Sequence, residues 1–189
     1  YINKLSKLNC SAFLVSNEHF NFKDYPNCTF ILVENTLDAL QKIATFHRKK
    51  FSLPVLAITG SYGKTIVKEW IYELLKDKYN VIRSPKSYNS QIGVALSVLQ
   101  LTEEHNLAIF EAGISIPNEM DKLRKIILPT HGVFTSFGEA HQQNFTSKEE
   151  KLSEKLKLFE EIDFIYNQDI STLSGIQKSA YSYGRNAGY

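Results

Sequence analysis

Apolar positions follow two patterns along most of the chain, short continuous runs and recurrence at helical spacing. Apolar runs typical of parallel strands covered on both faces lie at 55–59, 80–84, 107–113, 132–137 and 163–167. Between them, apolar residues recur at helical spacing over 65–78, 91–101, 118–127 and 147–162. Strands and helices that alternate in this way predict right-handed βαβ units. The pattern therefore predicts an α/β protein with a mostly parallel sheet flanked by helices.

The first fifty residues carry a sparser version of the same pattern. Two apolar runs, 12–16 and 29–34, predict strands on either side of a polar segment that contains proline. A helix is expected to begin at Asn35 or Thr36, because both are favourable N-cap residues. The charged segment 48–54 ends in a proline and separates this part from the rest. We therefore predict two units, a small α/β part over 1–50 and a larger domain over 51–189.

The turn "TGSYGKT" at 59–65 joins the run 55–59 to the next predicted helix. Gly60 and Gly63 allow the backbone to turn with its amides inward, and the helix N-terminus offers further free amides to an anion. Lys64 would then reach the β- and γ-phosphates, and the Thr65 hydroxyl would bind Mg²⁺. A tight turn with a solvated lysine is the alternative. The helix is expected to pack on the sheet through Ile66, Val67, Trp70, Ile71, Leu74 and Leu75.

Two charged residues fall where apolar neighbours are expected. Glu111 lies at the end of the run 107–113, so its carboxylate needs a metal or a partner such as a structural lysine. In the helix predicted over 147–162, where Ser147 and Glu150 form a capping box, Lys155 falls on the buried face and Lys157 on the opposite one. A buried lysine is costly unless it is paired or neutralised, or unless its stem reaches the surface.

Charge and composition argue against nucleic-acid and membrane partners. The 22 basic and 20 acidic residues leave a formal charge of +2, too balanced for a broad nucleic-acid-binding face. No apolar run approaches the roughly 20 residues that span a bilayer, and the first residues lack the features of a secretory signal. Cys10 and Cys28 have no metal-ligand spacing. We expect a cytoplasmic protein without nucleic-acid or membrane partners and, because Tyr1 is not an initiator methionine, a fragment of a longer chain.

The same turn carries a family resemblance. The common phosphate loop begins with a glycine where this chain has Ile58, whereas "TGSYGKT" resembles the T-G-(T/S)-x-G-K-(T/S) loop of the Mur ligases and the related folylpolyglutamate synthases. Mur ligases are ATP-dependent, amide-forming enzymes of peptidoglycan synthesis. The stretches 87–101, 107–123 and 135–145 resemble, in order, segments of the MurF type. The chain departs from that pattern at Tyr62, Ser87, Ser90, Ala95 and Ser136.

The resemblance implies roles for individual residues. ATP would be bound by Gly60, Ser61, Tyr62, Gly63, Lys64, Thr65 and Asn89. Thr65 and Glu111 would hold one Mg²⁺, and His141 with a carbamylated Lys155 would hold a second. Lys155 lies fourteen residues after His141, which is the family's spacing for the carbamylated lysine and favours it over Lys151 and Lys157. The implied catalytic residues are Lys64, His141 and Lys155.

The resemblance also implies a function for the longer chain. Residues 1–50 would end an N-terminal UDP-sugar-binding domain, and residues 51–189 would begin the central ATP-binding domain. The enzyme would join UDP-N-acetylmuramoyl-tripeptide to D-alanyl-D-alanine through an acyl phosphate, and the fragment alone is expected to be inactive. Another ligase of the superfamily, such as a different Mur enzyme or a folylpolyglutamate synthase, is one alternative, and a non-catalytic nucleotide-binding module is another. A fused alanine racemase, known in some bacteria, would lie outside this sequence.

Overall fold

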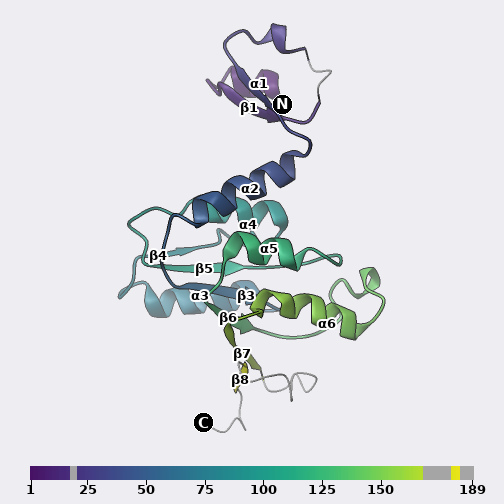
Figure 1. Cartoon of the computed structure of the whole chain (residues 1–189). Helices are drawn as coiled ribbons and strands as arrows, with labels where there is room; N and C mark the ends of the chain where they lie inside the picture. The colour runs from purple at the N-terminus through teal and green to yellow at the C-terminus, as the bar shows by residue number, and fades with distance from the viewer. Residues whose placement is uncertain (18–20, 168–179, 184–189) are drawn as a thin grey trace.

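The computed structural model describes residues 1–17, 21–167 and 180–183. Its N-terminal part contains the short helix α1 (Ile2–Ser6), strands β1 (Ala12–Val15) and β2 (Thr29–Leu32), and the single turn η1 (Phe22–Asp24). β1 and β2 pair in parallel, and the rings of Phe13 and Phe30 stack 5.5 Å apart across the pair. Figure 1 shows this part at one end of the molecule, connected to the rest through α2 (Thr36–Arg48).

Within the described residues, six parallel strands form the main sheet, in the order β4-β5-β3-β6-β7-β8. The strands are β3 (Val55–Thr59), β4 (Val81–Arg83), β5 (Leu107–Glu111), β6 (His131–Phe134), β7 (Asp163–Asn167) and β8 (Ala180–Tyr183). Every strand predicted from the apolar runs is present, although several are shorter than their runs. The predicted α/β class with a parallel sheet is confirmed.

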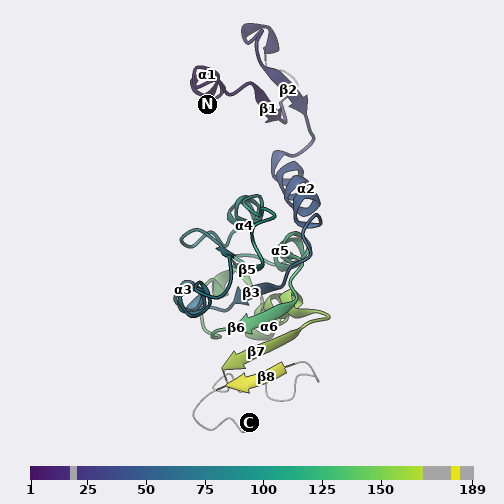
Figure 2. The ribbon, with the colours of Figure 1, turned by 90° about the vertical axis from the view of Figure 1, so that its left-hand side faces the viewer.

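Most helices cover one face of this sheet. α4 (Gln91–Val98), α5 (Met120–Ile127), α6 (Lys148–Leu156) and the single turn η3 (Lys157–Phe159) pack there over the larger apolar core. The single turn η2 (Gln142–Asn144) precedes α6 in the chain. α3 (Lys64–Leu75) lies over the other face, where Val67 and Ile71 contact Ile58, Ile109 and Val133. Figure 2 shows α3 and α5 on opposite sides of the sheet. The helix predicted as one unit over 147–162 is divided, because its last turns tighten into η3.

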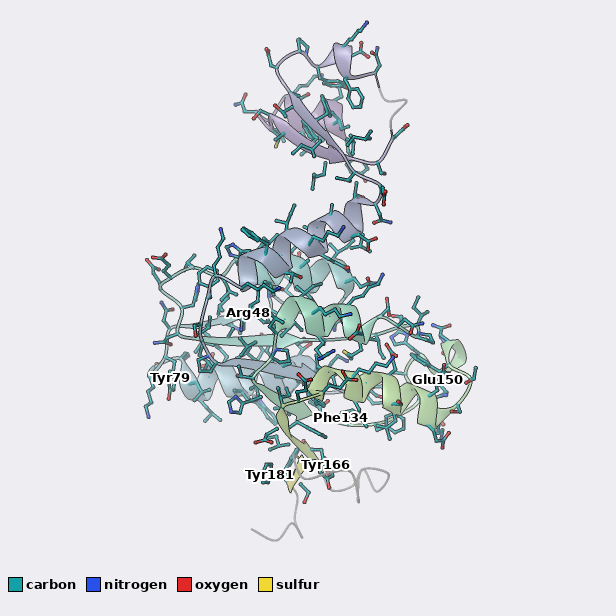
Figure 3. The ribbon with its side chains drawn as sticks, viewed as in Figure 1. Arg48, Tyr79, Phe134, Glu150, Tyr166 and Tyr181 are labelled. Carbon is teal, nitrogen blue, oxygen red and sulfur yellow. The ribbon has the colours of Figure 1, made fainter. Side chains whose placement is uncertain are left out.

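α2 packs against α4 and α5 of the larger core. Asn35 caps its N-terminus by accepting bonds from the amides of Leu37 and Asp38, as predicted. Arg48, labelled in Figure 3 at the other end of α2, donates to the carbonyls of Ile127 at 2.8 Å and Leu128 at 3.2 Å. The boundary between residues 50 and 51 stays a prediction. No helix within the described ranges has the length and apolar character needed to cross a bilayer.

The packing predicted for α3 is wrong for half of its apolar stripe. Ile66 is 57% exposed, Trp70 68% and Leu74 80%, whereas Lys68 on the same helix is fully buried. Lys64 and Lys68, one turn apart, are on the inward side together with Ile71, and this turns the outer apolar residues to the surface. The helix is therefore rotated relative to the orientation that apolar spacing alone predicts.

Candidate active site

A pocket of about 120 Å³ lies at the carboxyl ends of the central strands. Its walls come from the segments that follow β3, β4, β5 and β6, together with one side chain from α6. They are Gly60, Ser61, Lys64, Asn89, Ser90, Gly113, Ile114, Ser115, Glu119, Ala140, His141 and Lys155. Parallel sheets bind ligands in such positions, because all of these connections meet at one edge.

The turn after β3 has the backbone geometry of an anion site. Gly60 has a φ of +147°, and a Cβ built on it would lie 2.1 Å from Thr135 Oγ1, so the position requires glycine. Gly63, at a φ of +81°, is the N-cap of α3, and no described side chain caps this helix end. The first amides of α3 therefore have no partner within the helix and favour a bound anion. Lys64 Nζ donates to the Gly60 carbonyl at 2.9 Å, and burial lowers the pKa of Lys64.

The loop after β6 holds this turn in place. The Ser61 amide donates to the Ser136 carbonyl at 2.8 Å, and the Tyr62 amide donates to Ser136 Oγ at 2.9 Å. Thr135 Oγ1 donates in turn to the Tyr62 carbonyl at 2.6 Å. Two of the turn's amides are thus bonded to protein in this structure, and the amides at the start of α3 are the ones left for a ligand. Ser136, which departs from the family pattern, carries much of this attachment.

Tyr62 lies outside the pocket lining. Its side chain is 60% exposed, and its ring covers Gly138, where a Cβ would lie 2.7 Å from Tyr62 Cε2. The large residue is accommodated because the facing loop presents a glycine. Its predicted role in ATP binding stays a prediction, and the structure gives the ring a packing role on the loop after β6.

Thr65 and Glu111 lie together beside the pocket. Glu111 ends β5, is fully buried and accepts a hydrogen bond from Thr65 Oγ1 at 3.0 Å on Oε2. Its other oxygen, Oε1, lies 3.0 Å from Lys68 Nζ as an ion pair but takes no hydrogen bond from any described residue. Lys68 is therefore the structural lysine that was the alternative to a metal as the partner of Glu111. A hydroxyl and a buried carboxylate with an unbonded oxygen are also the hard oxygen ligands that suit one Mg²⁺.

Lys155 is buried on the inner face of α6, as predicted, with 4% of its surface exposed. Its Nζ lies 3.4 Å from the Gly60 carbonyl, and no carboxylate of the described residues pairs with it. Burial, followed by the nearby charges of Lys64 and Lys151, lowers the pKa of Lys155 to about 7. Lys157 instead pairs with Glu154 at 2.6 Å near the surface. The helix-face prediction that separated Lys155 from Lys157 is confirmed.

His141 lines the same pocket, from a left-handed backbone position with a φ of +59°. Within the described ranges, no group of three or more His, Cys, Asp or Glu side chains could hold a metal ion. An ammonium does not bind a cation, so His141 and Lys155 fit a second Mg²⁺ only when Lys155 supplies carbamate oxygens. Both this ligand set and the carbamate stay predictions.

Asn89 enters the pocket from the segment after β4. Its carbonyl accepts from the Gly113 amide at 2.8 Å, and a Cβ on Gly113 would lie 2.9 Å from Asn89 Oδ1. Ser90, the next residue, caps α4 by accepting from the Gly93 amide at 3.2 Å. Asn89 is thus held between the end of β5 and the start of α4, and it lines the same pocket as Lys64 and His141.

Two further charged residues of this region were not predicted from sequence. Glu119 lines the pocket and accepts from the amides of Ser115 at 2.6 Å and Ile116 at 3.0 Å. A carboxylate at the predicted start of a helix was the available signal for Glu119. Lys68 contacts Glu111. It lies outside the apolar stripe predicted for this helix, so the reasoning applied to Lys155 did not single it out.

The chain matches known proteins over most of its length. A family model described as "Mur ligase middle domain" matches residues 58–189. The UDP-N-acetylmuramoyl-tripeptide–D-alanyl-D-alanine ligase of Borreliella burgdorferi is 34% identical over 163 residues, which are 84% of this chain and 35% of that protein. The ligase of the same name from Rickettsia prowazekii is 30% identical over 200 residues, covering 99% of this chain and 44% of that one. The chain thus spans less than half the length of these relatives.

Solved structures agree with the sequence relatives. The crystal structure of the MurF ligase from Thermotoga maritima in complex with ADP superposes with a TM-score of 0.81 at 27% identity, covering 94% of this chain and 48% of that one. The parallel sheet, the turn after β3 and the family match over 58–189 agree with one another. The chain belongs to the Mur ligase family.

Proposed function

We propose that this chain carries the nucleotide-binding part of an ATP-dependent ligase that joins D-alanyl-D-alanine to UDP-N-acetylmuramoyl-tripeptide. The observation that carries the proposal is the shared pocket, where the uncapped start of α3 and Lys64 meet the buried Lys155 and the loop of His141. An anion site and a poorly solvated amine in one pocket suit phosphoryl transfer to a carboxylate. The names of the relatives supply the substrates.

The first chemical step is the activation of a carboxylate. A carboxylate oxygen of the tripeptide attacks the γ-phosphorus of ATP, the bond to the bridging oxygen breaks, and ADP leaves an acyl phosphate behind. Amides at the start of α3 donate to the phosphate oxygens, and the Lys64 ammonium offsets the charge that gathers on them. Asn89 lines the same pocket as this lysine and would orient the phosphate end of the nucleotide.

The second step forms the amide bond. The amine of D-alanyl-D-alanine attacks the acyl carbon and loses a proton, and the tetrahedral intermediate collapses with loss of inorganic phosphate. Magnesium bound by Thr65 and Glu111, and by His141 with a carbamate on Lys155, would reduce the repulsion between phosphate and carboxylate. The carbamate forms when the neutral Lys155 amine bonds to the carbon of CO₂ and releases a proton.

The Lys155 assignment has a direct spectroscopic test. In the full-length ligase supplied with ¹³C-bicarbonate, we expect a carbamate carbon resonance that Lys155→Ala abolishes and Lys157→Ala retains. Lys157 is the matched control, since it follows Lys155 by two residues but pairs with Glu154 near the surface. Short carboxylic acids should partly restore ligation to Lys155→Ala. A carbamate that survives in Lys155→Ala would contradict the assignment.

Replacing Lys64 tests the nucleotide site. In the full-length ligase, Lys64→Ala should lower the rate of ATP-dependent amide formation by roughly 10²-fold or more, since one phosphate-binding charge is lost. Lys76→Ala at the other end of α3, where Lys76 only pairs with Glu73 at the surface, is the control and should keep its activity. Unchanged ligation by Lys64→Ala would favour the non-catalytic module.

Substrate choice separates the proposal from other ligases of the superfamily. Phosphate release from ATP should depend on the UDP-sugar tripeptide and on D-alanyl-D-alanine. Glutamate in place of the dipeptide should release no phosphate above background. Release with glutamate or with a folate acceptor would instead identify a different Mur enzyme or a folylpolyglutamate synthase.

A further inference from the structure

Lys68 is a fully buried lysine that none of the proposed chemical steps uses. It lies one turn after Lys64 on α3, and its Nζ is surrounded by oxygen atoms from three segments of the chain. It forms ion pairs at 3.0 Å with Glu111 Oε1 and at 3.0 Å with Glu69 Oε1. It also donates to the carbonyl of Ser84 at 2.8 Å and to that of Lys86.

These contacts connect α3 to two segments with predicted ligands, the end of β5 with Glu111 and the segment after β4 that leads to Asn89. Glu111 is the last residue of β5, and its amide donates to Ser84 Oγ at 3.1 Å. Ser84 and Lys86 open the segment after β4 that leads to Asn89 in the pocket wall. Lys86 has a φ of +48°, an uncommon left-handed position, and its carbonyl is among those that Lys68 binds. Lys68 thus forms an ion pair with the carboxylate and donates hydrogen bonds to the start of the Asn89 segment at the same time.

The direction of the Glu111 carboxylate depends on this arrangement. Lys68 attracts Oε1 from one side, and the Thr65 hydroxyl bonds Oε2 from the other. With Oε1 in an ion pair with Lys68 and Oε2 in a hydrogen bond with Thr65, the carboxylate is held in one direction, and Oε1 takes no hydrogen bond from any described residue. Groups that orient a metal-binding carboxylate in this way commonly change metal affinity by 10- to 100-fold when removed.

We propose that Lys68 is a positioning residue for the magnesium-dependent binding of ATP, acting by fixing the Glu111 carboxylate against Thr65 and the segment before Asn89. This inference rests on the proposed function, because it takes Glu111 as a magnesium ligand. In the simpler alternative, the buried ammonium only neutralises the buried carboxylate or competes with the cation for it.

The test measures ATP binding by isothermal titration in the full-length ligase at a series of Mg²⁺ concentrations. Lys68→Met keeps the length of the stem and removes the charge. The Mg²⁺ concentration at half-maximal ATP binding should rise about tenfold or more in this variant. An unchanged or lower Mg²⁺ requirement would overturn the proposal, the lower one by showing that the ammonium competes with the cation.

Glu69→Gln is the matched control. Glu69 and Glu111 lie at the same 3.0 Å from the Lys68 ammonium, but Glu69 is partly exposed and faces Arg83 instead of Thr65. Its substitution should leave the Mg²⁺ requirement within about twofold of the wild type, because it removes a partner of Lys68 and keeps Glu111 oriented. An equal effect of Glu69→Gln and Lys68→Met would contradict an action through Glu111.

A second comparison remains informative if Lys68→Met leaves Glu111 unpaired and unfolds the protein. The double variant Lys68→Met with Glu111→Gln removes both buried charges together and is compared with Glu111→Gln alone. The two should share one Mg²⁺ requirement, and a further increase in the double variant would refute the proposal. A wild-type ligase that shows no Mg²⁺-dependent ATP binding would refute the proposed function itself, which is a different result.

Discussion

The Gly60 carbonyl accepts hydrogen bonds from two lysines, Lys64 at 2.9 Å and Lys155 at 3.4 Å. Lys151 likewise donates to the Gly138 carbonyl, and Lys68 to the carbonyls that follow β4. For Lys64, Lys155 and Lys151, backbone oxygens thus take the place that carboxylates usually have beside buried lysines, whereas Lys68 also pairs with Glu69 and Glu111. A carbonyl does not offset a full charge, and this explains why burial lowers the pKa of Lys155 so far.

Lys155→Met should stabilise the protein in CO₂-free, Mg²⁺-free buffer. The pKa of Lys155 falls from 10.5 in the unfolded chain to about 7 in the folded one, so the unfolded state holds more protons between these values. Wild-type stability therefore rises with pH across about 7 to 10.5, and below that window the full cost of burying the charge persists. The variant removes this cost, which is on the order of a few kcal/mol at pH 7.

Denaturant unfolding of both proteins at several pH values measures this difference. The stability gain of Lys155→Met should be largest at or below about pH 7 and should vanish toward pH 10.5. Lys157→Met provides the control, because the Lys157 pKa is raised by its hydrogen bond to Glu154. A gain that does not change with pH would contradict the assigned cause.

At the scale of elements, the turn between β3 and α3 shows how far sequence reasoning reaches. Strand, glycine turn and helix were predicted from apolar spacing and from the two glycines. The rotation of α3 was not, because six apolar residues span too wide an arc to define one face. Lys68 settles the orientation through carbonyl partners on another segment, which no local pattern reveals. Likewise, Ser136, in the loop after β6, holds the turn through hydrogen bonds with the backbone of Tyr62. The two residues are far apart in sequence, so no local pattern indicates this contact.

The two glycines of the turn should differ in their tolerance of a side chain. Gly60→Ala places a Cβ 2.1 Å from Thr135 Oγ1 and 2.9 Å from the Ser136 amide nitrogen, so the turn or the neighbouring loop must move. Gly63→Ala meets only Thr135 Cβ at 4.0 Å and carries the cost of its positive φ, about 1 kcal/mol. Unfolding free energies should therefore fall by several kcal/mol for Gly60→Ala and by about 1 for Gly63→Ala. Equal losses would contradict the close approach of the two loops.

Two identical substitutions test the rotation of α3. Leu74 is 80% exposed, whereas Leu123 of α5 is fully buried in the larger core. Leu74→Ala should change the unfolding free energy of this chain by about 0.5 kcal/mol or less, and Leu123→Ala should lower it by about 2 to 5 kcal/mol. Chemical denaturation of the two variants provides the comparison, and a large loss for Leu74→Ala would restore the packing that apolar spacing alone predicts.

At the scale of the whole molecule, the parallel sheet explains why residues far apart in sequence share one pocket. The segments after β3, β4, β5 and β6 leave from the same edge and bring Lys64, Asn89, Glu119 and His141 together. The alternation of strands and helices predicted this class and this edge. The strand order, with β3 between β5 and β6, depends on contacts between distant segments and was not predictable. The family resemblance selected the residues within that edge, since spacing alone left each of them an alternative.

The most direct measurement is the product formed by the full-length ligase. Incubated with ATP, Mg²⁺, UDP-N-acetylmuramoyl-tripeptide and D-alanyl-D-alanine, it should yield the UDP-linked pentapeptide by mass spectrometry. ADP and phosphate should each appear in equal amount to that product, and Lys64→Ala should form almost none of it. ATP that is bound without any amide product, or product formed equally well by Lys64→Ala, would contradict the proposed ligase.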